Sequence, residues 1–183
     1  MSVLQKLTTL VHRIVQPASA HCDTEEGPVV TAGRRALAAG NVNIALMWVR
    51  AEDEAEVRAA FDAAQHASTP EVERAYLEVL VRLHRASEGH GYDGIKPAGT
   101  PLPPVVTAGD KALETGDVRV VLPLVEGDER EAVTLRFATM LALRDHDVDD
   151  LATARKFVAA YVDFIHYALH HRLGTGQVAA HQH

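Results

Sequence analysis

The stretch PVVTAGRRALAAGNVNIALMWV, from Pro28 to Val49, decides the fold because the chain repeats it closely as PVVTAGDKALETGDVRVVLPLV, from Pro104 to Val125. Of the 22 aligned positions, 12 are identical without a gap. Self-similarity at a fixed spacing is the signature of repeat architectures. The sequence therefore predicts two copies of one unit, 76 positions apart (104 minus 28).

Proline and glycine mark where the helices of each copy begin and end. Pro28 and Pro104 suit a first helical turn, and Gly40 and Gly116 suit the left-handed residue that ends a helix. Longer helices are expected at about 52–66 and 71–87, and again at 128–143 and 150–171, with no competing strand pattern.

These elements predict an all-α fold of two tandem helical repeats, packed about a pseudo-two-fold axis. A single helical domain is expected over residues 21–173. It would consist of repeat one at 28–87, a linker rich in glycine and proline at 88–103, and repeat two at 104–171. Residues 174–183 are expected to form a flexible tail.

Residues 1–20 are expected to be a leader or propeptide-like segment, because Ala18-Ser19-Ala20 has the small-x-small form of a processing site. Lys6, His12 and Arg13 interrupt the apolar centre that a secretory signal would need. An amphipathic leader is therefore favoured over an export signal, and an ordinary first helix ending before Pro17 is a third interpretation.

Composition excludes several classes of protein. The chain has 18 Lys and Arg against 25 Asp and Glu, a net charge of -7, which argues against nucleic acid as a partner. No apolar run approaches the roughly 20 residues of a membrane span. The single cysteine requires no oxidising compartment, so a cytoplasmic location is favoured and export is the alternative.

The single cysteine, Cys22, follows His21 immediately after the small-residue triplet. Cleavage after Ala20 would give His21 a free amine. That amine, the Cys22 amide nitrogen and the Cys22 thiolate could then close adjacent chelate rings, with the His21 imidazole as a further donor. Mixed nitrogen and thiolate donors suit Ni(II) or Cu(II), and softer tetrahedral sets suit zinc. Without cleavage the amine does not exist.

The stretch SAHCDTEEG resembles the start of nickel superoxide dismutase, in which a leader is removed ahead of an HCDLPCG metal hook. His21, Cys22, Asp23 and Gly27 match that hook, whereas its second cysteine falls on Glu26. The resemblance implies nickel binding and superoxide chemistry with one thiolate missing. A wider resemblance, through HCDTEEGPVV, RLHRASEGHGYDGIKPAG and YVDFIHY, is to an uncharacterised bacterial helical family.

Two histidines, His84 and His166, lie near the ends of the last helix of each repeat. Glu88 and His170 follow four residues later, on the same helix face. Asp163 lies one turn before His166. A pseudo-axis between the repeats would bring both imidazoles to one pocket, close to Cys22.

The sequence thus predicts a metal-binding helical protein, with nickel favoured and copper or zinc as alternatives. Nickel-dependent redox chemistry is one version of this hypothesis. The others are a non-enzymatic metal carrier or sensor, and a structural interaction module without metal. A processing protease and a homo-oligomer are left open as partners. The expected ligands are His21, Cys22, His84 and His166, supported by Asp23, Glu26, Glu88, Asp163 and His170.

Overall fold

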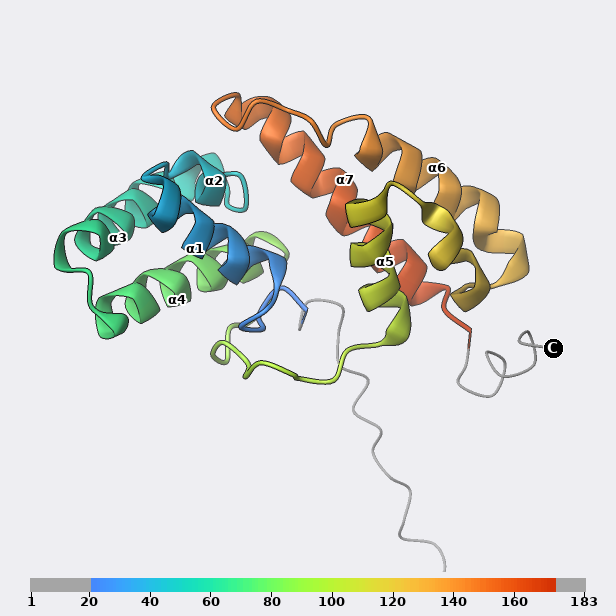
Figure 1. Cartoon of the computed structure of the whole chain (residues 1–183), viewed down its shortest axis with the longest axis horizontal. Helices are drawn as coiled ribbons and strands as arrows, with labels where there is room; N and C mark the ends of the chain where they lie inside the picture. The colour runs from blue at the N-terminus through green and yellow to red at the C-terminus, as the bar shows by residue number, and fades with distance from the viewer. Residues whose placement is uncertain (1–20, 174–183) are drawn as a thin grey trace, which may run out of the picture.

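A computed structural model describes residues 21–173, and the leader at 1–20 and the tail at 174–183 lie outside the described residues. The prediction of an all-α fold is confirmed, since the described part consists of helices joined by turns, with only isolated β-bridges. Figure 1 shows two groups of helices, with α1 to α4 in one and α5 to α7 in the other. We call them the first lobe (28–87) and the second lobe (104–170).

Each lobe begins with one helix, continues through short helical turns and ends with two longer helices. The first contains α1 (Pro28–Ala39), α2 (Asn43–Leu46), a 3-10 turn η3 (Ala51–Asp53), α3 (Glu54–Ala67) and α4 (Pro70–Ser87). The second contains α5 (Pro104–Thr115), the 3-10 turns η4 (Val118–Val120), η5 (Leu122–Leu124) and η6 (Gly127–Glu129), then α6 (Arg130–Leu141) and α7 (Leu151–His170).

The prolines and glycines singled out in the sequence mark the ends of α1 and α5. Pro28 and Pro104 open these helices, and Gly40 (φ 63°) and Gly116 (φ 71°) end them in the left-handed conformation. The short second helix differs between lobes. Where the first lobe has α2, the second has η4 and η5 with Pro123 inside η5, because proline cannot donate the hydrogen bond of a continuous helix.

Within each lobe the first helix packs closely on the last through a glycine. Gly33 of α1 and Gly109 of α5 occupy the same place in the repeated VTAG motif. A Cβ on Gly33 would lie 2.6 Å from Leu77 Cδ2, and one on Gly109 would lie 2.3 Å from Ile165 Cδ1. Glycine at this position therefore sets the spacing between the two helices.

We expect Gly109→Ala to lower the free energy of unfolding by roughly 1–3 kcal/mol, the usual cost of inserting a methyl group into a packed core. Ile165 is buried and its neighbour Phe164 is completely buried, so neither has room to move. Urea unfolding would measure the loss. Gly127→Ala is the control, because a Cβ there meets nothing within 4 Å. Equal midpoints for Gly109→Ala and the wild type would contradict this packing.

Polar bridges and one aromatic contact join the lobes. Arg155 of α7 donates from Nε to the Val49 carbonyl (3.0 Å) and from Nη2 to Glu54 (2.6 Å). The rings of Trp48 and Tyr161 meet edge to face with centroids 6.0 Å apart. The packing of the repeats about a pseudo-two-fold axis stays a prediction. Across the described range, no helix has the length and apolar character that crossing a membrane requires.

Candidate metal centre

Residues 21–27, which we call the hook, form a tight turn ahead of α1. The Thr24 hydroxyl donates to the His21 carbonyl (3.1 Å), and the Gly27 amide donates to the Thr24 carbonyl (2.9 Å). A Cβ on Gly27 would lie 2.2 Å from the His21 carbonyl oxygen, so glycine allows this closure. The linker holds the hook from outside, since the Lys96 amide donates to the Asp23 carbonyl (2.7 Å).

Side chains of both lobes bind the hook. His21 Nε2 donates to Asp110 Oδ2 of α5 (2.7 Å), and the Tyr161 hydroxyl donates to the other oxygen of the same carboxylate (2.7 Å). On the first lobe, Arg34 donates to the carbonyl of Glu25 (2.9 Å) and pairs with its carboxylate. His21, Cys22, Asp23 and Thr24 are consequently all buried.

The Cys22 thiol is buried and 4% exposed. Burial raises its pKa well above the usual range, and the charges of Glu88, Asp23 and Asp110 raise it further. A cysteine in such surroundings stays protonated and is a poor nucleophile. The negative charges that raise this pKa would also favour a cation bound near the sulfur.

His84, near the end of α4, is 2% exposed. Its Nδ1 donates to the Trp48 carbonyl (2.9 Å), which leaves the lone pair on Nε2. That Nε2 has no hydrogen-bond partner among the described residues and lies 3.6 Å from Glu88 Oε1. Burial lowers the pKa of His84, so the ring is neutral at neutral pH.

Glu88 completes this arrangement one turn after His84. Its side chain is 10% exposed, and within residues 21–173 neither carboxylate oxygen has a hydrogen-bond partner. Two acceptors, an imidazole nitrogen and a carboxylate oxygen, therefore face each other in a buried place. Such a pair needs a proton or a cation between its members, because an unpaired buried acceptor costs free energy.

The structure places His84 beside Glu88 at 3.6 Å, and the charge of Glu88 is among those that raise the pKa of Cys22. His166 is half-buried on α7, and its charge is among those that lower the pKa of His84. The His21 imidazole binds Asp110 through Nε2, which leaves Nδ1 as its other ring nitrogen.

Three expected supporting residues make other contacts. Asp163 is exposed and pairs with Arg136 of α6 (3.1 Å). His170 is exposed, with its ring 4.9 Å from that of His171. Glu26 is also exposed and accepts a hydrogen bond from the Gly99 amide (3.1 Å). None of these three contacts reaches Cys22 or His84.

Sequence reasoning missed Arg34, Asp110 and Arg85, which contact the hook, and Tyr161, which binds Asp110. Arg85 is 8% exposed, lies 3.3 Å from Asp23 Oδ2, and donates from Nε and Nη2 to the Gly91 carbonyl. The signal for Arg85 was its place next to His84. Within the 22 aligned positions, Asp110 could have been found as the one acidic residue where repeat one has an arginine.

Side chains alone do not complete a metal site. Over residues 21–173, no group of three or more His, Cys, Asp or Glu side chains is positioned to hold an ion. The main-chain nitrogens of His21 and Cys22 are the further donors that the sequence predicts here. Metal binding at this place stays a prediction, and it depends on cleavage after Ala20.

Asp23 predicts a pH dependence of stability. Burial raises its pKa to about 6, although the charge of Arg85 opposes this rise. The folded protein therefore binds the Asp23 proton more tightly than the unfolded chain, and this contribution to the free energy of unfolding falls as pH rises from about 4 to about 6. Asp23→Asn should lack that part of the fall. Urea unfolding at pH 4, 5, 6 and 7 measures it, with exposed Asp62→Asn as the control. Identical pH profiles for Asp23→Asn and the wild type would refute it.

The model of the family of unknown function DUF6448 matches residues 26–167, well over half of the chain. The chain belongs to this family. The DUF6448 match begins at Glu26 and spans both lobes, so it includes His84, Glu88 and His166 but not His21 or Cys22. No protein of curated function and no solved structure matches the chain.

Proposed function

We propose that the protein, once cut after Ala20, binds one transition metal ion between the hook and the end of α4. One observation carries this proposal. The lone pair of His84 Nε2 faces Glu88 Oε1 at 3.6 Å, both atoms are buried, and neither has a hydrogen-bond partner among the described residues. A cation held by both atoms would satisfy them together.

The hydrogen bonding of His84 supports a role as a metal ligand. A metal-binding histidine commonly donates its other ring N–H to a backbone carbonyl, which fixes the tautomer and orients the ring. The bond from Nδ1 to the Trp48 carbonyl does this here, and the Trp48 ring packs edge to face on the imidazole with centroids 5.6 Å apart. His166 is then a neighbour able to act as a further ligand or proton donor.

The hook would supply the remaining donors. The Cys22 thiol would lose its proton on metal binding, which makes uptake release protons and weaken at low pH. The terminal amine of His21 and the Cys22 amide nitrogen complete a nitrogen and thiolate set, for which nickel is favoured and copper or zinc are alternatives. A processing protease is then a required partner. A cytoplasmic location, with export as the alternative, and a homo-oligomer stay predictions.

The decisive experiment compares two forms of the chain. One begins at His21 after removal of a cleavable N-terminal extension, and the other keeps residues 1–20. Each is incubated with nickel, copper or zinc salts, desalted, and examined by elemental analysis and intact mass. We expect about one ion per processed chain and much weaker retention by the uncut form. No metal on the processed chain would favour the structural interaction module.

We expect the nickel-loaded, processed protein to accelerate superoxide decay little over free nickel salt. The hook position of the second cysteine is Glu26, whose carboxylate is exposed and binds the Gly99 amide, so it replaces no thiolate. Thiolates are the softer donors, and a single one leaves the metal less able to cycle. The measurement is superoxide decay with loaded, metal-free and Cys22→Ser protein. Rapid decay abolished by Cys22→Ser would establish the enzyme instead; otherwise metal carriage or sensing is the better description.

A further inference from the structure

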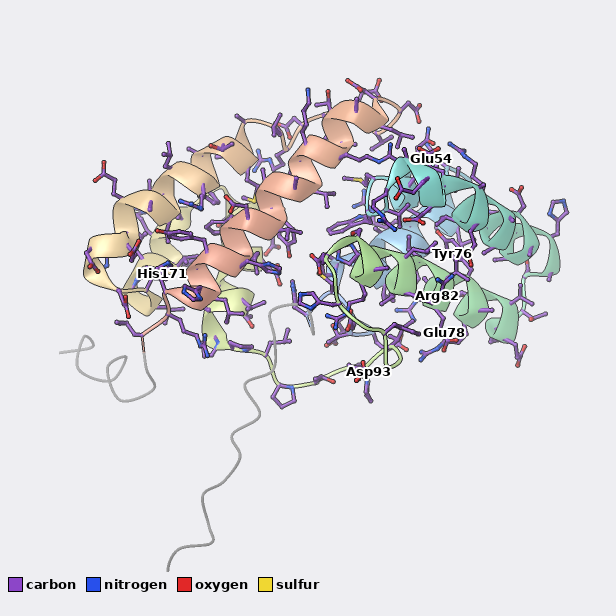
Figure 2. The ribbon with its side chains drawn as sticks, turned by 180° about the vertical axis from the view of Figure 1, so that it is seen from behind. Glu54, Tyr76, Glu78, Arg82, Asp93 and His171 are labelled. Carbon is purple, nitrogen blue, oxygen red and sulfur yellow. The ribbon has the colours of Figure 1, made fainter. Side chains whose placement is uncertain are left out.

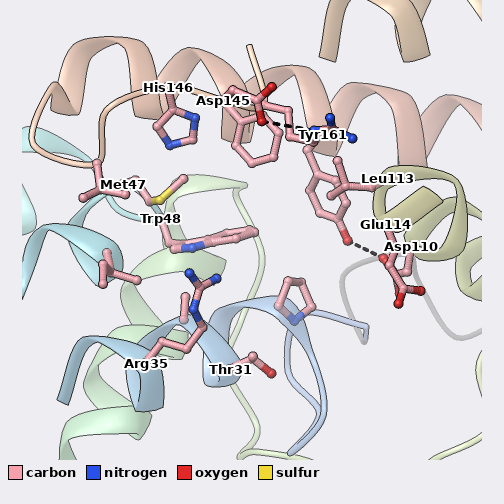
Figure 3. A pocket seen from close by; sticks show the side chains of 16 residues that line it. Thr31, Arg35, Met47, Trp48, Asp110, Leu113, Glu114, Asp145, His146 and Tyr161 are labelled. Atoms are coloured by element: carbon pink, nitrogen blue, oxygen red, sulfur yellow. Dashed lines mark hydrogen bonds and ion pairs between the residues drawn. The ribbon is translucent and has the colours of Figure 1, made fainter. Parts of the chain in front are cut away.

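A cleft of about 850 Å³ lies between the lobes, beside the hook. Figure 3 shows Trp48 and Met47 of the first lobe on one side of it and Tyr161 of the second lobe on the other. Ile44, Leu113 and Phe157 add further apolar surface. A concave and largely apolar cavity of this size, with a few polar groups, is typical of small-molecule sites.

The acidic residues that line the cleft have polar partners, whereas one of its arginines has none among the described residues. Its three acidic residues all have partners: Asp110 binds His21 and Tyr161, Glu114 pairs with Lys111 (2.7 Å), and Asp145 pairs with Arg144 (3.3 Å). Arg35 of α1, in contrast, has no ion pair or side-chain hydrogen bond with any residue in the described range. Figure 3 shows its guanidinium group reaching up into the cleft toward the Trp48 ring.

We propose that this cleft binds a small organic carboxylate with an aromatic or aliphatic body. The carboxylate pairs with the Arg35 guanidinium, whose planar fork matches two carboxylate oxygens. The apolar body lies against the rings of Trp48 and Tyr161, where a flat ligand gains stacking and burial. This inference is independent of the metal proposal, because it uses neither Cys22 nor His84.

Trp48 is the only tryptophan in the chain, so its fluorescence reports directly on the cleft. The experiment titrates metal-free protein, in EDTA, with phenylacetate and with its neutral isostere phenylacetamide at constant ionic strength. We expect saturable change in Trp48 emission with phenylacetate, and at least 10-fold weaker binding of the amide. Working without metal keeps this result separate from the outcome of the metal experiment.

Arg35→Gln tests the assigned residue, since it keeps length and polarity but removes the charge. We expect it to weaken phenylacetate binding by about 10-fold or more, the usual worth of a charge-assisted hydrogen-bonded pair, with Arg35→Lys intermediate. Arg119→Gln, whose side chain is 84% exposed and paired with Asp117 outside the cleft, is the matched control and should bind as the wild type. Equal affinity for phenylacetate and phenylacetamide, or wild-type affinity in Arg35→Gln, would overturn the proposal, as would the absence of saturable binding.

Discussion

Replacing His84 with glutamine is expected to weaken metal binding by the processed protein by about 100-fold or more. Even the loss of a group that only orients a ligand typically costs 10–100-fold in metal affinity, and the loss of a ligand costs at least as much. His84 is placed for this role by its buried Nε2, aimed at Glu88, and by the bond from Nδ1 to Trp48. Competition against a chelator of known affinity measures the change.

Two further variants keep this experiment interpretable. Glu88→Gln preserves shape while removing the charge, so it tests the site even where His84→Gln disturbs packing. His66→Gln is the control, because that exposed histidine of α3 lies outside the centre and binds only the Asp62 carbonyl. Unfolding curves of the metal-free variants separate lost ligands from lost structure. If His84→Gln and Glu88→Gln both fold and bind metal like the wild type, the centre lies elsewhere.

Replacing Arg85 with alanine is expected to lower the free energy of unfolding by about 3–5 kcal/mol, the cost of leaving one member of a buried ion pair uncompensated. Asp23 is 1% exposed and would lose Arg85, its one ion-pair partner within residues 21–173, while the Gly91 carbonyl would lose two donors. Figure 2 shows the end of α4 and the linker that follows it, in which Asp93 is labelled. Urea unfolding at pH 7 measures the loss.

The double variant Arg85→Ala with Asp23→Asn separates charge from packing. If the loss comes from the buried carboxylate, the amide should restore part of it, and lowering the pH below 6 should narrow the gap between Arg85→Ala and the wild type. Arg119→Ala, at an exposed pair, should change stability by less than about 1 kcal/mol. A small effect of Arg85→Ala at pH 7 would show that solvent reaches Asp23.

The helices were the most predictable part of the molecule. Local signals, such as Pro28 and Gly40 around α1, are written in adjacent residues, and the spacing of His84 and Glu88 sufficed to place them on one face. Contacts across the lobes left no such local signal. Tyr161 fits the apolar stripe of α7 equally well whether or not its hydroxyl meets Asp110, so its role depends on how the second lobe sits beside the hook.

Asp163 shows, within one helix, that contacts with neighbouring helices cannot be predicted from local sequence. Asp163 and His166 are three residues apart and lie about 60° apart around the helix axis. Only the packing of α6 against α7 decides that Asp163 turns toward Arg136 while His166 remains half-buried. Sequence spacing predicts which residues can share a face, whereas the neighbouring helix decides which side of that face is used.

Arg34 and Asp110 stand at the same position of the two repeats, 76 residues apart (110 minus 34), within PVVTAGR and PVVTAGD. Each grips the hook, but with opposite charge: Arg34 binds Glu25 and Asp110 binds His21. The same position of the repeat thus presents a cation to one part of the hook and an anion to another. Because the hook is a single asymmetric segment, two identical repeats would present the same charge to both parts, and the difference at this position lets each lobe form its own ion pair.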